Sequence, residues 1–192
     1  MAELKESLKK FWEFLKKDSW PSFMVSLILA LIIIKFIFFP IMTLLTGTIL
    51  PLVIVESCSM YHSESLDQIV GSNLYSQYGI SINNTSDWVL KNGFTKGDII
   101  FVLGPNNLKV GDVIIFATNQ TPNPIIHRVV NINTDGTYAT KGDHNNGFLS
   151  YEKSISKEQI LGKAVFKVPV IGWIKLIFFD WKKPIDQRGF CK

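Results

Sequence analysis

One long apolar stretch near the N-terminus limits what this chain can fold into more than any other feature. From Ser19 to Ile34 no residue is charged, Lys35 follows, and residues 36–55 are again without charge. About 20 apolar residues in a helix cross the hydrocarbon core of a bilayer. We therefore expect one transmembrane helix over residues 20–43, which is too long for the apolar core of a cleaved signal peptide. Lys35 can extend its ammonium group to the membrane surface.

The residues on the two sides of this helix differ in charge, and this difference indicates its direction in the membrane. Five lysines precede it, at positions 5, 9, 10, 16 and 17, whereas residues 36–90 contain no Lys or Arg. Positive charge tends to stay on the cytoplasmic side. Residues 1–19 also place apolar side chains at helical spacing, which predicts an amphipathic helix at the membrane surface. We expect a cytoplasmic N-terminus, a single pass through the cell membrane and an extracytoplasmic domain.

Residues 44–169 have the pattern of a mainly β domain. Short runs rich in β-branched residues alternate with clusters of Gly, Asn and Pro, as in antiparallel sheets with tight turns. The expected strands are Leu52 to Val55, Asp98 to Leu103, Val113 to Ala117, Ile125 to Ile132, Thr137 to Thr140 and Ile160 to Val168. Residues 61–93 differ, because Ser65 and Gln68 can form a capping box. We expect one short helix there, in a surface insertion.

The last segment, residues 170–192, mixes large apolar residues with Lys and Arg. It is too short to span a bilayer, but Trp and Lys favour the interface between lipid and water. We interpret it as a membrane-proximal segment, with an ordinary buried terminal strand or helix as the alternative. The chain of 192 residues thus divides into an interfacial helix (1–19), an anchor (20–43), a β domain (44–169) and this segment.

Composition excludes several classes of protein. The 20 Lys and Arg residues are scattered among 16 Asp and Glu residues without a dense basic run, so nucleic acid is not an expected partner. Two cysteines, Cys58 and Cys191, are too few for a disulfide scaffold, and the usual spacings of metal ligands are missing. We expect no metal and no organic cofactor, and we interpret Cys58 as a small buried residue.

The residues that could carry chemistry begin directly after the apolar run, with Ser-Cys-Ser-Met at 57–60. A serine becomes a useful nucleophile when a base takes its proton and hydrogen-bond donors stabilise the oxyanion. The chain has three histidines, and His127 lies in an expected strand. Lysines that stand beside Gly-Asp turns are the alternative bases, namely Lys96, Lys109 and Lys141.

Four motifs, in this order, resemble type I signal peptidases of the archaeal and endoplasmic-reticulum kind. They are Ser-x-Ser-Met after an N-terminal anchor (57–60), two Gly-Asp turns before strands (97–98 and 111–112), His-Arg-Val (127–129) and Thr-Lys-Gly-Asp-x-Asn (140–145). The resemblance covers about residues 20 to 175.

This resemblance implies a role for individual residues. Ser59 would be the nucleophile, and the Ser59 amide and the Ser57 hydroxyl would form the oxyanion hole. His127 would be the general base, at a position where the bacterial branch has lysine. Asp143 would orient His127. Because the chain lacks the second aspartate that the family often has after this motif, the third member of the triad is open between Asp143, Glu152 and none.

The function that the resemblance implies is that of a membrane-bound serine endopeptidase. It would remove signal peptides from exported preproteins by cutting after a small-x-small sequence on the outer face of the membrane. Its partners would be those signal peptides and the lipid bilayer. The protein translocation machinery is a further partner compatible with this function. Two alternatives remain open. One is a catalytically silent, membrane-tethered β domain that binds exported proteins, and the other is a membrane-anchored serine protease with other exported substrates.

Overall fold

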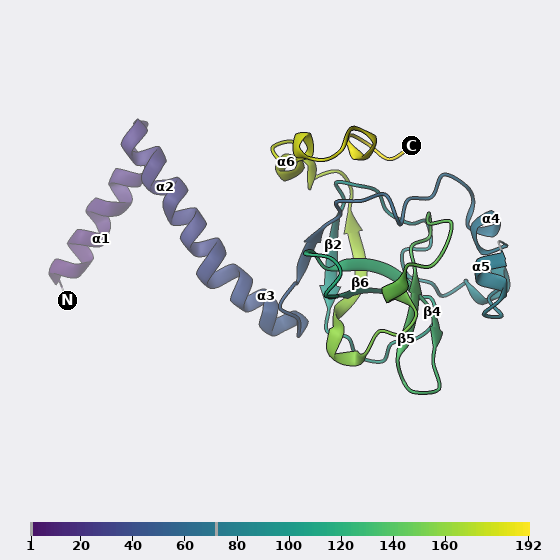
Figure 1. The fold of residues 1–192 in the computed structure, drawn as a ribbon. Helices are drawn as coiled ribbons and strands as arrows, with labels where there is room; N and C mark the ends of the chain where they lie inside the picture. The colour runs from purple at the N-terminus through teal and green to yellow at the C-terminus, as the bar shows by residue number, and fades with distance from the viewer. Residues whose placement is uncertain (1, 72) are drawn as a thin grey trace. The chain divides into compact units, whose positions relative to one another are not determined.

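The computed structural model describes residues 2–71 and 73–192, which divide into two compact units. The first unit ends at Leu45 and is helical; the second begins at Thr46 and is built on a β sheet (Figure 1). The predicted fold class, a mainly β domain preceded by an amphipathic helix and one long apolar helix, is confirmed.

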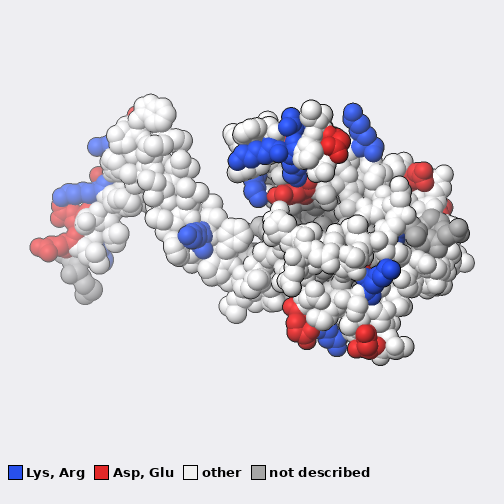
Figure 2. Space-filling view, viewed as in Figure 1, with Lys and Arg blue, Asp and Glu red and all other residues white. Residues whose placement is uncertain are grey.

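The apolar helix is continuous over the segment predicted from the sequence. The helical elements are α1 (Ala2–Leu15), α2 (Trp20–Ile33), a π-helical turn (Ile34–Phe38) and α3 (Phe39–Thr46). The 27 residues from Trp20 to Thr46 are long and apolar enough to cross a membrane. Most of their large apolar side chains are exposed, and Figure 2 shows this helix as mostly uncharged surface. Such a surface is unfavourable in water and suits surrounding lipid. The π-helical turn contains Lys35.

In the part of the second unit that the structure describes, the strands form a six-stranded antiparallel sheet in the order β1-β2-β6-β3-β4-β5. Its strands are β1 (Leu52–Ile54), β2 (Ile99–Leu103), β3 (Val113–Phe116), β4 (Ile125–Ile132), β5 (Tyr138–Lys141) and β6 (Ile160–Val168). Every predicted strand is confirmed, with each boundary within one residue of its expected place. The long strand β6 pairs with both β2 and β3, so it joins the two halves of the sheet.

Two similar turns introduce β2 and β3. In each, an aspartate accepts a hydrogen bond from the backbone N–H three residues earlier: Thr95 donates to Asp98 and Lys109 donates to Asp112, both over 3.0 Å. This local bond closes the turn without help from the rest of the sheet. The interpretation of both aspartates as turn-forming residues is confirmed.

The glycines of these two turns are required for packing as well as for backbone shape. Gly97 and Gly111 have φ values of +90° and +95°, which side chains disfavour. A Cβ at Gly97 would lie 2.1 Å from the Trp173 ring, and one at Gly111 would lie 2.1 Å from the Trp88 ring. Each turn therefore receives an indole from another part of the chain, Trp173 from the C-terminal segment and Trp88 from residues 61–93.

Some side chains of residues 61–93 pack on the sheet, while many others in this region are exposed. The described residues of this region contain two short α-helices, α4 (Leu66–Val70) and α5 (Asn73–Ser76), and a 3-10 turn (Ile82–Asn84), where one helix was expected. The predicted capping box of Ser65 and Gln68 is present at α4. An apolar cluster joins this region to β4 and β5 through Val70, Tyr75, Ile80, Trp88, Val130 and Ala139. Figure 1 shows α4 and α5 beside this end of the sheet. Burial of these large side chains fixes the region against β4.

Candidate active site

The two serines of the Ser-Cys-Ser-Met sequence lie in a loop between β1 and α4 that forms no helix or strand around them. Val55 and Met60 are buried in the core at the two ends of this loop. Ser57 is exposed and Ser59 is half-buried, and their hydroxyl oxygens lie 3.2 Å apart, within hydrogen-bond distance. The sheet thus anchors the loop on both sides while both hydroxyl groups stay near solvent.

His127 lies on β4 and is paired with Glu152. The distance from His127 Nδ1 to Glu152 Oε1 is 2.5 Å, and both side chains are buried. The other carboxylate oxygen, Oε2, accepts a 2.6 Å hydrogen bond from the backbone N–H of Leu149. When Glu152 is ionised, its carboxylate accepts a hydrogen bond from the Nδ1–H group of His127, which leaves the ring's free lone pair on Nε2. An imidazole held in this form can act as a base at Nε2.

A short turn after β5 contacts both the serine loop and His127. The backbone N–H of His144 donates a 2.8 Å hydrogen bond to the carbonyl oxygen of Ser59. A Cβ at position 142 would lie 2.9 Å from His127 Nε2 and 2.6 Å from the Asn145 amide nitrogen. Gly142 therefore leaves room at the Nε2 edge of the ring. Residues 142–145 border both members of the proposed Ser–His pair.

The structure gives Asp143 a different set of partners from the one expected. Its carboxylate pairs with Arg128 (2.7 Å from Nη2) and accepts hydrogen bonds from Tyr75 Oη (2.7 Å); His62 Nε2 lies 2.8 Å away. The carboxylate that pairs with His127 belongs to Glu152, which was an alternative to Asp143 for this position. The reason is strand geometry: His127 and Arg128 are neighbours on β4, so their side chains point to opposite faces.

Arg128 is fully buried, and all five of its N–H groups have acceptors. Besides Asp143, the guanidinium donates to the carbonyl oxygens of Val89 (3.1 Å), Leu90 (3.1 Å) and Gly111 (2.9 Å). A buried guanidinium is tolerated when it is paired and its hydrogen bonds are complete. Arg128 therefore joins β4, the turn before β3 and residues 61–93 around one carboxylate.

These contacts determine the protonation of the groups around Asp143. Burial raises the pKa of the Asp143 carboxyl, but the Arg128 charge and the hydrogen bonds of His62, Arg128 and Tyr75 outweigh burial and hold this pKa below its ordinary value. Burial and the neighbouring Asp143 carboxylate raise the pKa of the Tyr75 hydroxyl. At neutral pH Asp143 is therefore ionised and accepts hydrogen bonds, and Tyr75 keeps its proton and donates one to Asp143.

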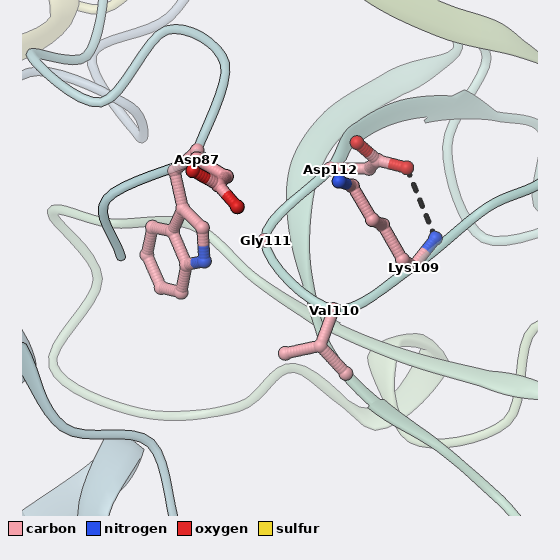
Figure 3. A pocket seen from close by; sticks show the side chains of 6 residues that line it. Asp87, Lys109, Val110, Gly111 and Asp112 are labelled. Carbon is pink, nitrogen blue, oxygen red and sulfur yellow. Dashed lines mark hydrogen bonds between the residues drawn. The ribbon is translucent and has the colours of Figure 1, made fainter. Parts of the chain in front are cut away.

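The three lysines considered as alternative bases are in different surroundings. Lys141 Nζ donates to the Gly142 carbonyl oxygen over 2.9 Å and lies 5.0 Å from the centre of the Tyr75 ring, and burial lowers the pKa of its amine. Lys96 forms an ion pair with Asp180. Lys109 belongs to the turn of residues 109–112, which lines a cavity of about 170 Å³ together with Trp88 (Figure 3). Of the three, Lys141 alone neighbours the turn that borders His127.

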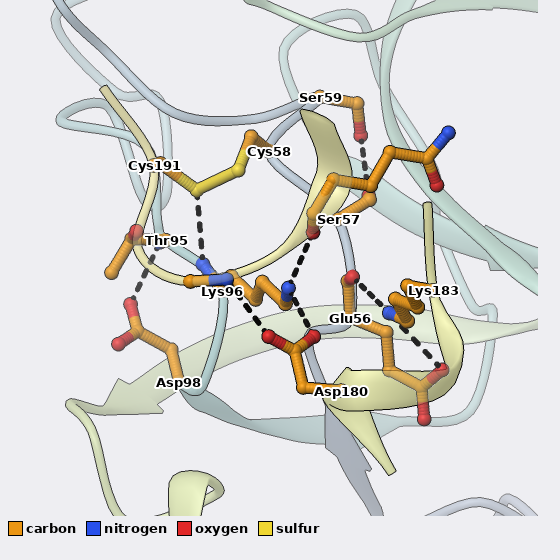
Figure 4. The surroundings of a disulfide bond; sticks show 12 residues. Glu56, Ser57, Cys58, Ser59, Thr95, Lys96, Asp98, Asp180, Lys183 and Cys191 are labelled. Carbon is orange, nitrogen blue, oxygen red and sulfur yellow. Dashed lines mark hydrogen bonds and ion pairs between the residues drawn. A yellow bond between two sulfur atoms is a disulfide. The ribbon is translucent and has the colours of Figure 1, made fainter. Parts of the chain in front are cut away.

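The two cysteines form a disulfide, which the sequence analysis did not predict. Cys58 and Cys191 are 133 residues apart in sequence, and their Cα atoms are 5.6 Å apart (Figure 4). The interpretation of Cys58 as a small packing residue is therefore wrong, and its thiol is not available as a nucleophile. The signal was present in the predicted topology, since two cysteines in an exported domain face an oxidising environment. Among the described residues, no cluster of three His, Cys, Asp or Glu side chains could hold a metal ion.

The structure is a β domain preceded by one helix that is long and apolar enough to cross a membrane, and one turn of this domain borders Ser59 and His127, which is paired with Glu152. Curated proteins similar to this chain are named signal peptidase complex catalytic subunits. The sec11 protein of Dictyostelium discoideum is 30% identical over 98 residues, which cover 46% of this chain and 55% of that protein. SEC11 of Lachancea thermotolerans is 34% identical over 95 residues, 43% of this chain and 56% of that protein.

A human protein with the same kind of name is similar to this chain at lower sequence identity. SEC11C of Homo sapiens is 26% identical over 101 residues, which cover 47% of this chain and 53% of that protein. This chain spans about half the length of the curated relatives it matches, and no family model matches it. The resemblance to signal peptidases of the endoplasmic-reticulum kind, expected from four motifs, is confirmed by these relatives.

We predict that Asp143→Asn destabilises the domain by about 3–5 kcal/mol at neutral pH, because it leaves the buried Arg128 charge without its partner. The pKa of Asp143 is lowered in the folded state, so its contribution is complete above the unfolded value of about 3.9 and is lost as pH falls through the folded pKa. Urea unfolding of the full chain in mild detergent, followed by tryptophan fluorescence at several pH values, measures this.

The difference between wild type and Asp143→Asn should shrink below about pH 4, where the wild-type carboxyl of the unfolded chain is protonated. Asp135→Asn is the matched control, since that carboxylate is exposed in the turn before β5 and bonds to Thr137. Equal destabilisation by the two variants would contradict the central role of the Arg128–Asp143 pair.

Proposed function

We propose that this protein is a membrane-bound serine endopeptidase that removes signal peptides from exported preproteins. The observation that supports this most directly is the pairing of His127 with Glu152 beside the turn that also binds the Ser59 carbonyl oxygen. The names of the curated relatives support the same reaction class. We further propose that cleavage follows a small-x-small sequence and that the protein translocation machinery is a partner.

In the proposed mechanism Ser59 Oγ attacks the scissile carbonyl carbon while His127 Nε2 accepts the hydroxyl proton. The imidazolium then returns this proton to the leaving amine, and water hydrolyses the acyl-enzyme by the same route. Glu152 stabilises the imidazolium through Nδ1. The Ser59 N–H and the Ser57 hydroxyl stabilise the oxyanion. Asp143 has no direct part in this scheme; it holds the turn that lies between Ser59 and His127.

We propose that the N-terminus is cytoplasmic and that the sheet domain lies outside the cell membrane. Five lysines precede the apolar helix, whereas residues 36–90 contain no Lys or Arg. The disulfide is an independent observation in favour, because disulfides persist in oxidising compartments outside the cytoplasm. An anchored enzyme meets a membrane-inserted signal peptide at a high effective concentration.

Residues 170–192 fit a second contact with lipid. They carry exposed apolar side chains that would be unfavourable in water, namely Val170, Ile171, Ile174, Ile177, Phe178, Phe179, Trp181, Ile185 and Phe190. Lysines and an arginine lie among them, and Figure 2 shows positive charge gathered on this segment. Apolar side chains mixed with cations are typical of a segment that lies on an anionic membrane surface.

The two alternative functions considered from the sequence predict different outcomes when the protein is incubated with a preprotein and with an unfolded exported protein. A catalytically silent domain that binds exported proteins would retain a preprotein without cutting it. A serine protease with other exported substrates would cut an unfolded exported protein but leave the signal-peptide junction intact. The buried Glu152–His127 pair favours an enzyme over a silent binder, since burying two ionisable side chains is costly without a role.

We expect Ser59→Ala to abolish cleavage of a membrane-inserted preprotein by the purified full-length protein. Ser57→Ala should lower kcat by about 10²–10³, because it removes one oxyanion donor. Ser86→Ala, at an exposed serine within residues 61–93, is the matched control and should cut normally. Gel analysis and mass spectrometry of the new N-terminus measure the result. Undiminished cleavage by Ser59→Ala would refute the assignment of the nucleophile.

We expect Glu152→Gln to lower kcat by about 10²–10⁴, because the amide no longer holds His127 in the tautomer that leaves Nε2 free. His127→Ala should lose nearly all turnover, and wild-type activity should fall on acidification because a protonated imidazole cannot accept the serine proton. Steady-state rates between pH 5 and pH 9 test this. Lys141→Met should stay active and should lose activity on acidification over the same pH range as wild type. An inactive Lys141→Met together with an active His127→Ala would show a Ser–Lys mechanism instead.

We expect an epitope tag at the N-terminus to be protected in intact cells and a tag within residues 61–93 to be accessible to antibody. The distribution of lysines around the apolar helix is the reason. Permeabilised cells are the control, in which both tags should be accessible. The reverse pattern in intact cells would rule out the proposed orientation.

A further inference from the structure

The disulfide joins the interior of the serine loop to the end of the chain. Cys58 separates Ser57 from Ser59, and its partner is Cys191 in a chain of 192 residues. Figure 4 shows the disulfide and both serines in the same region. Because this loop forms no helix or strand, the ladder hydrogen bonds of the sheet do not fix the serines directly.

A second contact ties the C-terminal segment to the same loop. Lys183 Nζ donates a 2.7 Å hydrogen bond to the carbonyl oxygen of Glu56, and it lies 3.9 Å from the Glu56 carboxylate. Residues on both sides of Ser57 are therefore held by the segment that follows β6, one through a charged hydrogen bond and the other through a covalent bond (Figure 4).

The C-terminal segment is itself fixed to the sheet domain through Lys96. The ammonium group of Lys96 is buried, forms an ion pair with Asp180 and donates a 2.7 Å hydrogen bond to the carbonyl oxygen of Gln187. The Trp173 indole N–H donates to the Lys96 carbonyl oxygen over 3.0 Å, and the Gly189 N–H donates to Asp180 over 2.8 Å. These contacts give the disulfide a fixed support on the turn before β2.

On its other side the serine loop is held by backbone bonds. The Ser59 carbonyl oxygen accepts from His144, and the Met60 carbonyl oxygen accepts from Phe94 over 3.0 Å. Ser59 thus lies between two supports, the turn that borders His127 and the disulfide-linked C-terminal segment. Removing one support leaves the loop attached but free to change the direction of its hydroxyl groups.

We propose that Cys191 is a positioning residue, which acts through Cys58 to hold Ser57 and Ser59 in the arrangement needed for turnover. The inference rests on the proposed function. A displacement of about 1 Å at a reacting group costs on the order of a hundredfold in rate. The disulfide is therefore expected to act on kcat and not on KM, because a misplaced nucleophile slows the attack without removing a binding contact.

The test compares the full-length protein in lipid nanodiscs as oxidised wild type, wild type reduced with a phosphine, and Cys58→Ser/Cys191→Ser. The substrate is a preprotein with a fluorescent signal peptide. Reduction and the double substitution should each lower kcat by about tenfold or more and change KM less than about twofold. The phosphine should have no further effect on the double variant. Lys192→Ser, at the exposed neighbour of Cys191, is the matched control and should behave as wild type.

Hydrogen exchange measured on the same samples separates positioning from general stabilisation. Loss of the disulfide should speed exchange in residues 55–62 and leave β4 and β6 protected. An unchanged kcat after reduction, or faster exchange throughout the sheet domain, would overturn the proposal. If oxidised wild type shows no Ser59-dependent cleavage, the proposed function fails, and unchanged exchange in residues 55–62 then also refutes the positioning role.

Discussion

The buried pair of Arg128 and Asp143 is the interaction on which the arrangement of the candidate site depends. The guanidinium joins carbonyl oxygens from residues 61–93 and from the turn before β3, and the carboxylate lies in the turn after β5. Breaking such a buried pair costs about 3–5 kcal/mol, a large part of the stability of a small domain. Since the same turn binds the Ser59 carbonyl oxygen, an interaction outside the proposed chemistry determines where the serine lies.

The alternation of side chains along β4 separates the Arg128–Asp143 ion pair from the His127–Glu152 pair that we propose for catalysis. His127 and Arg128 are adjacent in sequence, yet they point to opposite faces of the strand and meet different carboxylates. Asp143, ionised beside Arg128, holds the fold together. Glu152, anchored by the Leu149 N–H, is left to pair with His127. The two carboxylates therefore have different partners because their partners point to opposite faces of β4.

The chain reinforces the serine loop from outside the sheet. A covalent bond from Cys191 and a charged hydrogen bond from Lys183 reach the loop from a segment rich in exposed apolar side chains. If this segment lies on a membrane surface, as proposed, the loop that carries Ser59 is linked to that surface. A signal peptide and the serine would then meet at the same interface.

The sequence by itself determined the apolar helix, the six strands and the two Asp-closed turns, because each depends on hydrophobic period or on bonds between residues at most a few positions apart. The resemblance left the third member of the proposed triad open between Asp143, Glu152 and none. Only the tertiary structure showed that Glu152 pairs with His127, that Asp143 pairs with Arg128 and that Cys58 is joined to Cys191. Those pairings join side chains that are far apart in the sequence and meet only in the folded domain, and no local pattern of residues contains that information.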